Sequence, residues 1–121
     1  MGEDRTGSHR FGKKKRILKR SDFIRLSKIN RKVQNQHFVA LYIKGATERT
    51  RLGITVTKRV GNAVARNQLK RYVREFFRHY YHTVQRGTDI NIIVKRKASD
   101  IPSTEAYRSL KNIFCKIREN S

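Results

Sequence analysis

Four cations recur at four-residue spacing in the middle of the chain, at Arg66, Lys70, Arg74 and Arg78. In a helix this step keeps side chains close together on one face, which shifts slowly around the axis. Like charges four residues apart repel one another, so a polyanion that neutralises them is the expected partner. The chemistry predicted for this stretch is phosphate binding.

The residues before these cations strengthen that prediction. Gly61 permits a tight turn into the helix and Asn62 can cap it, while Lys58 and Arg59 add charge to its positive end. Arg66 offers the two-pronged hydrogen bonding that suits phosphate. The candidate nucleic-acid-binding residues are Lys58, Arg59, Gly61, Asn62, Arg66, Asn67, Lys70, Arg71 and Arg74.

The charge balance of the whole chain points to the same partner. Its 121 residues contain 30 Lys and Arg against 9 Asp and Glu, a formal net charge of +21. Nucleic acid is the commonest partner of so large a surplus. A membrane surface is the weaker interpretation, because the basic helix is rich in aromatic residues and its apolar side resembles a core face.

No enzyme site is predicted. Acidic residues are too scarce and scattered for paired carboxylates or a two-metal centre. The four histidines (His9, His37, His79 and His82) have no ligand spacing with each other or with the single Cys115. We therefore assign no catalytic residue and no metal ligand, and we do not expect the polypeptide alone to cleave a substrate.

The single cysteine excludes a disulfide within the chain, and no apolar run approaches the roughly 20 residues of a spanning helix. No hydrophobic segment follows the N-terminal charges, so a secretory signal is not expected. These features predict a cytoplasmic location.

The pattern of apolar residues predicts one domain over residues 16–121, after a flexible basic arm over 1–15. The expected elements are a helix over 22–28, one or two strands within 33–44, a strand over 52–56, a helix from 62 to about 84, a strand over 89–95 and a helix after Pro102. This order predicts an α+β fold, a two-layer sandwich with a sheet of three or four strands packed on helices.

One face of that sheet is expected to stay open. If the larger apolar residues of the strands face the helices, the residues facing away are Gly53, Thr55, Thr57, Asn91, Ile93 and Lys95. A small, polar sheet face with aromatics nearby suits an extended single strand of RNA or DNA. Phe23, Phe38 and Tyr42 are the nearby aromatics, although aromatics in such places belong to the core more often than not.

The central stretch resembles the protein subunit of bacterial ribonuclease P. That family carries a Lys-Arg-x-Gly-x-Ala-Val-x-Arg-Asn run followed by Lys-Arg and Arg-Glu, and the preceding residues 51–56 also resemble its strand. The similarity extends from about Arg16 through the last helix. The matching residues are Lys58, Arg59, Gly61, Ala63, Val64, Arg66, Asn67, Lys70, Arg71, Arg74 and Glu75.

The resemblance implies a four-stranded sheet with a left-handed crossover through the long helix, opposite to the general rule. It also implies an accessory role in an endoribonuclease: the RNA subunit, with Mg²⁺ bound mainly by RNA, cleaves precursor tRNA and releases its 5′ leader. The long helix would face the RNA subunit, and the sheet with the first helix would hold the leader. The implied leader-cleft residues are Phe23, Ser27, Phe38, Tyr42, Thr55, Thr57 and Lys95.

Two positions depart from the family pattern. Gln68 stands where the Arg-Asn-Arg triplet has its second arginine, so one cation is missing. Ser27 stands where the family often has the second of two aromatics in the first helix, which removes a stacking surface.

Two other interpretations fit the composition. A ribosomal or ribosome-associated protein would have the same basic arm and small mixed domain, and a DNA-binding module would place the long helix in a major groove. The sequence leaves the oligomeric state open.

Overall fold

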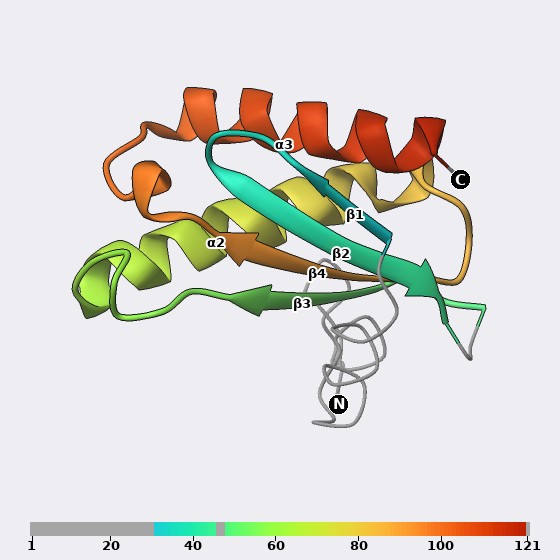
Figure 1. Ribbon diagram of the computed structural model, residues 1–121, viewed down its shortest axis with the longest axis horizontal. Coiled ribbons are helices and arrows are strands. Elements are labelled where there is room, and N and C mark those ends of the chain that lie inside the picture. The colour runs from blue at the N-terminus through green and yellow to red at the C-terminus, as the bar shows by residue number, and fades with distance from the viewer. Residues whose placement is uncertain (1–30, 46–47, 121) are drawn as a thin grey trace.

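The computed structural model describes residues 31–45 and 48–120 (Figure 1). The predicted arm and first helix, with Phe23 and Ser27, lie outside the described residues. The elements are β1 (Arg31–Gln34), β2 (Phe38–Lys44), β3 (Arg51–Thr55), α2 (Ala63–Tyr80), β4 (Thr88–Val94) and α3 (Ser103–Glu119), with short 3₁₀ helices η2 (Tyr81–Thr83) and η3 (Arg96–Ala98).

The four strands form one mixed sheet in the order β1-β2-β4-β3. β2 is antiparallel to both β1 and β4, whereas β3 and β4 are parallel neighbours joined through α2. Both long helices cover the same face of this sheet (Figure 1). The predicted α+β fold is confirmed; the hand of the crossover stays a prediction.

The stretch predicted as one or two strands is two, because Asn35 forms a turn between them. Its side-chain Oδ1 accepts hydrogen bonds from the backbone N–H groups of His37 and Phe38, each at 3.0 Å. An Asx side chain that bonds to the backbone in this way reverses the chain locally. His37 therefore lies in the turn, immediately before β2, and not within a strand.

The core lies between the sheet and the two helices. Both helices turn an apolar side toward the sheet, and the buried residues of α2 are Leu69, Val73, Phe76 and Phe77. The Phe76 and Phe114 rings meet edge to face, with centroids 5.0 Å apart, and so join the two helices. The inward residues of α3 are Ala106, Leu110, Ile113, Phe114 and Ile117.

The placement of Phe38 and Tyr42 in an open cleft is wrong. Phe38 is 0% and Tyr42 4% exposed, and both belong to the core. Their register partners are Val94 and Ile90, which face the helices. Because side chains alternate along a strand, this register turns both rings toward the core and away from the open face.

A buried ion pair fixes β3 against β4. Asp89 is fully buried, and Arg51 holds it in two-pronged fashion, Nε to Oδ1 at 2.9 Å and Nη2 to Oδ2 at 2.7 Å. Gly45 covers this carboxylate so closely that a Cβ there would lie 2.6 Å from Asp89 Oδ1. The register of β3 against β4 therefore depends on Arg51, and the space for the Asp89 carboxylate depends on Gly45.

A second polar contact joins the two helices. The Tyr107 hydroxyl of α3 donates to Glu75 Oε1 of α2 at 3.1 Å, and Arg71 lies 3.5 Å from the other carboxylate oxygen. Burial raises the pKa of Tyr107 above its usual 10.0, and the hydrogen bond and negative charge of Glu75 raise it further. The neutral phenol is thus the form favoured by folding.

Replacing Tyr107 with phenylalanine is expected to lower the free energy of unfolding by about 0.5–1 kcal/mol at neutral pH. A group whose pKa is raised by folding stabilises the protein below its unfolded pKa and loses that effect as pH rises through the folded pKa. The difference between the two proteins should therefore be constant below about pH 9 and shrink above about pH 10. Urea unfolding across this range checks it; a difference that is insensitive to alkaline pH would contradict it.

Candidate nucleic-acid interface

The start of α2 is built as the sequence predicts. Asn62 is the N-cap, and its side-chain Oδ1 accepts a hydrogen bond from the Ala65 N–H at 2.9 Å. Val60 is buried and its N–H donates to Thr57 O at 3.1 Å, which anchors the preceding turn. No acidic side chain lies in the first turn, so the positive end of the helix keeps its full potential.

Gly61 lies in tight contact with α2 and does not have a positive φ. Gly87 is the glycine with a positive φ in the part of the chain described, so Gly61 needs no special backbone conformation. A Cβ at Gly61 would instead lie 3.1 Å from the Ala65 Cβ. The glycine lets the loop approach the first turn of α2 closely.

The cations of α2 shift from the core boundary to solvent along the helix. Arg66, Lys70 and Arg74 are half-buried, whereas Arg78 is exposed. We call these four residues the α2 stripe. Arg66 Nε is shielded from solvent and has no hydrogen-bond partner, and an unpaired buried donor is costly. We therefore expect the Arg66 side chain to move so that Nε donates a hydrogen bond when an anion binds.

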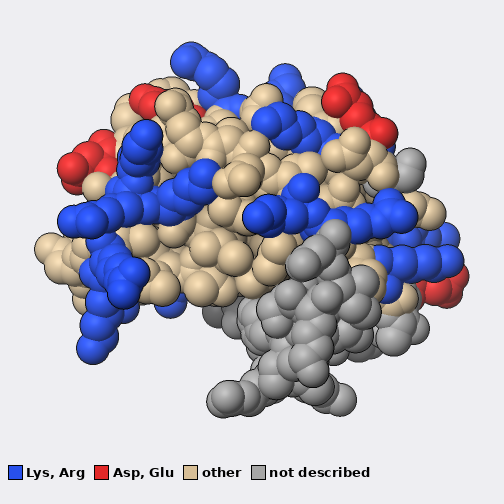
Figure 2. Space-filling model, in the orientation of Figure 1, with Lys and Arg blue, Asp and Glu red and all other residues tan. Residues whose placement is uncertain are grey.

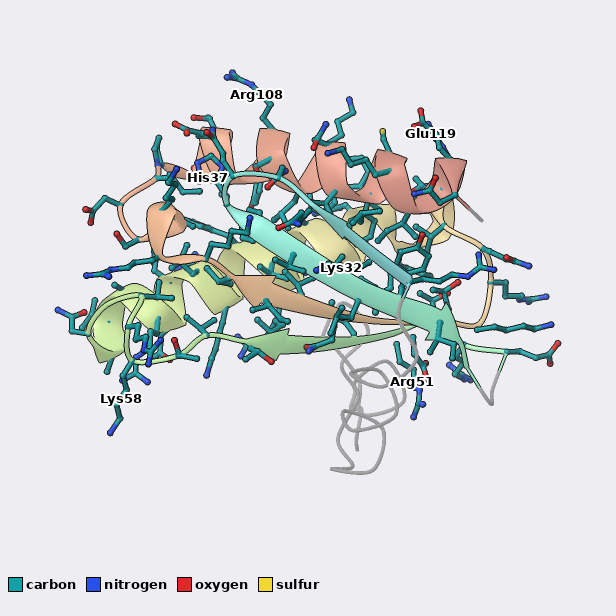
Figure 3. All side chains as sticks on the ribbon, in the orientation of Figure 1. Lys32, His37, Arg51, Lys58, Arg108 and Glu119 are labelled. Atoms are coloured by element: carbon teal, nitrogen blue, oxygen red, sulfur yellow. The ribbon has the colours of Figure 1, made fainter. Side chains whose placement is uncertain are left out.

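The other predicted binding residues surround the α2 stripe. Asn67 and Arg71 are exposed next to it, and Lys58 and Arg59 are exposed in the loop before α2. Lys58 projects away from the body of the protein at that end (Figure 3). Lys and Arg side chains lie at this end and also along the rest of the face shown in Figure 2. The structure thus brings the predicted set together on one helix and the loop that leads into it.

Gln68 lies beside this set. Its side chain is exposed and Nε2 donates to the Tyr72 hydroxyl at 2.7 Å, one helical turn further on. The neutral residue therefore has a local partner and adds no repulsion to an already cationic helix.

The open sheet face carries the remaining described candidates. Thr55 Oγ1 donates to Asn91 Oδ1 at 3.4 Å, and Thr57 is exposed just after β3. Lys95 follows β4 and its Nζ donates to Asn35 O at 2.8 Å. Because β3 and β4 are parallel, Thr57 and Lys95 follow strand ends at the same edge of the sheet.

The open sheet face is more apolar than the small polar face predicted from β3 and β4. Three half-buried aliphatic residues of β2 also lie on it: Val39, Leu41 and Ile43. Asn91 lies on this face as predicted, opposite Leu41 in the register of β2 and β4, but its side chain is only 6% exposed.

The described residues do not fit a metal site on the protein. Over residues 31–45 and 48–120, no three His, Cys, Asp or Glu side chains lie close enough together to hold an ion. Asp89 is paired with Arg51, and Glu75 with Tyr107.

No helix in the described ranges is long and apolar enough to cross a membrane.

The chain is similar in sequence and fold to ribonuclease P proteins. The family model described as Ribonuclease P matches residues 11–118. The ribonuclease P protein component of Desulforapulum autotrophicum is 44% identical over 111 residues, which cover 92% of this chain and 95% of the relative. That of Thermotoga maritima is 39% identical over 90 residues, 74% of this chain and 77% of the relative.

Solved structures agree. The RNase P protein of Staphylococcus aureus has a TM-score of 0.79 and 34% identity, covering 86% of this chain and 97% of its own. The RNase P protein from Thermotoga maritima has a TM-score of 0.77 and 35% identity, covering 84% and 96%. The chain belongs to the family of bacterial ribonuclease P protein components.

Proposed function

We propose that the chain binds the RNA subunit of ribonuclease P through the α2 stripe and the loop before it. The observation that carries this proposal is the arrangement of Arg66, Lys70 and Arg74, whose half-buried side chains lie at the edge of the core beside a helix start without acidic residues. Cations held in this way meet a phosphate backbone with less loss of side-chain entropy than fully mobile ones.

The open sheet face is proposed to hold the 5′ leader of precursor tRNA. Thr55, Thr57 and Lys95 supply hydrogen-bond donors at one edge, and the aliphatic residues of β2 supply a surface for bases or ribose. Ligands of open sheets commonly lie beyond the carboxyl ends of parallel strands, which here are the ends of β3 and β4. Phe38 and Tyr42 are buried in the core and are not proposed to contact the leader.

In this role the protein serves endonucleolytic 5′ maturation of tRNA in the cytoplasm, and the RNA subunit performs the chemistry. Mg²⁺ in the assembled enzyme is proposed to be bound by RNA, because the described acidic side chains are scattered or already paired. The contribution of the polypeptide is to neutralise phosphates and to position the two RNAs.

Competition binding tests this proposal against the ribosomal alternative. Labelled ribonuclease P RNA is bound to the full chain near physiological salt, and unlabelled ribosomal RNA of equal length is added. We expect at least about a 100-fold excess of ribosomal RNA to be needed for half displacement, since specific binding exceeds non-specific binding by a large factor. Displacement by an equal amount would contradict the proposal and favour general or ribosomal RNA binding.

A further inference from the structure

The edge strand β1 is joined to α3 along a polar seam. Among the strands in residues 31–45 and 48–120, β1 pairs with β2 alone, and it also contacts α3. Lys116 Nζ donates to Gln34 O at 2.9 Å, and Arg31 Nη1 donates to Asn120 O at 3.1 Å. The α3 side of this β1–α3 seam is one stripe at helical spacing: Glu105, Ser109, Asn112 and Lys116.

At one end the seam opens into a depression of about 520 Å³ between the β1–β2 turn and the first half of α3. That volume lies within the usual range of small-ligand sites. His37 and Ser109 line it, although they are only 5% and 8% exposed. The rim is formed by Gln36, Glu105 and Arg108.

Hydrogen bonds hold the walls of this depression in place. Asn35 Nδ2 donates to Ser109 O at 2.9 Å and to Asn112 Oδ1 at 3.1 Å. The His37 ring bridges the two sides, with Nδ1 3.0 Å from Ser109 Oγ and Nε2 3.3 Å from Glu105 Oε2. The site is therefore largely preformed, which lowers the entropy cost of binding.

The groups on the rim suit a ribonucleotide. Arg108 can form two hydrogen bonds to a phosphate. The Glu105 carboxylate, 43% exposed, repels a bare anion but accepts a hydrogen bond from a ribose 2′-hydroxyl. The side-chain amides of Gln36 and Asn112 both donate and accept, as recognition of a base edge requires. None of the lining side chains is aliphatic, so the depression offers no apolar contact for a lipid or an apolar peptide.

We propose that the β1–α3 seam is a second RNA-binding surface and that the depression beside His37 takes one nucleotide of a single strand. Arg108 and Lys116 are eight residues apart on α3, about 12 Å along the axis, which places cations along a short run of phosphates. Arg108 and Lys58 project from opposite edges of the molecule (Figure 3). This surface is separate from the α2 stripe, so one protein can hold two strands.

Binding of a short fluorescent single-stranded RNA to the full chain tests the proposal. In a background of Arg66→Ala, Lys70→Ala, Arg74→Ala and Arg78→Ala, the remaining affinity reports surfaces other than the α2 stripe. Adding Gln36→Ala and Arg108→Ala should lower it about tenfold, because a charge-assisted contact is lost. The matched pair Gln85→Ala and Arg86→Ala also removes one exposed amide and one exposed cation, but at the opposite end of the sheet, and should lower it less than about threefold. Equal losses in the two pairs, or none, would overturn the proposal.

Two further measurements keep the test independent of the proposed function and of folding. RNA containing 4-thiouridine, irradiated with the unmodified chain, should crosslink to peptides from residues 34–37 or 103–116; crosslinks confined to 51–80 would overturn the proposal. Glu105→Ala should reduce the preference for RNA over DNA of the same sequence, because the side-chain acceptor for the 2′-hydroxyl is lost. An unchanged preference would remove Glu105 and its ribose contact from the site.

Discussion

Replacing Arg66, Lys70 and Arg74 together with alanine is expected to weaken binding of ribonuclease P RNA by about 100- to 1,000-fold. Each substitution removes a charge-assisted contact to phosphate, and such contacts contribute about 1.5–3 kcal/mol before losses from non-additivity. The slope of log affinity against log salt should fall by about two to three, because fewer counterions are released. Titration of labelled RNA at several salt concentrations measures both quantities.

The matched control keeps the charge and changes only the geometry. Arg66→Lys with Arg74→Lys should leave the salt slope unchanged and weaken binding less, because lysine cannot form the two-pronged contact. The triple alanine variant should melt at the same or a higher temperature, since alanine favours helix and relieves the repulsion within α2. Loss of RNA binding together with a clear loss of stability would indicate a structural role for the α2 stripe and contradict the assignment.

Arg51→Leu is expected to lower the free energy of unfolding by about 3–5 kcal/mol. The substitution removes the two-pronged partner of the fully buried Asp89 carboxylate, and removing one partner of a buried ion pair costs about that much. Urea unfolding followed by circular dichroism measures the change. A loss of stability of this size would weaken the pairing of β3 with β4, and with it the position of the loop between β3 and α2.

The control for this prediction is Arg96→Leu, the same chemical change at an exposed position in η3, which should alter stability by less than about 0.5 kcal/mol. Gly45→Ala tests the same site from the other side, since its Cβ would lie 2.6 Å from Asp89 Oδ1. A loss below about 1 kcal/mol for Arg51→Leu would contradict a structural role for the ion pair.

The elements with strong local signals were predictable from the sequence. The helix cap at Asn62, the buried stripe of α3 and the alternation along β3 each depend on residues close together in the chain. The predicted end of α2 was too late, because residues 81–83 continue the apolar pattern but form a 3₁₀ turn. The pattern cannot separate these two helix types, since both wind in the same sense with similar periods.

Features that depend on register were not predictable. The sequence shows that Phe38 and Tyr42 share a strand face, but only pairing with Val94 and Ile90 decides which face that is. The Arg51–Asp89 pair joins residues 38 positions apart, and the contacts of the β1–α3 seam and its depression join residues 68 (His37–Glu105) to 89 positions apart. No local pattern encodes such contacts, so the second basic surface had no signal of its own beyond the high overall charge.

Reconstitution of precursor-tRNA cleavage is the most direct test of the central claim, that this chain supplies binding and placement to a catalytic RNA. A bacterial ribonuclease P RNA and a precursor tRNA are incubated at low Mg²⁺ with and without the protein, and release of the 5′ leader is measured. We predict that leader release is faster with the protein by at least about tenfold, a barrier difference of roughly 1.4 kcal/mol, and that the protein without the RNA subunit releases none. No stimulation by the protein, or leader release by the protein alone, would contradict the claim.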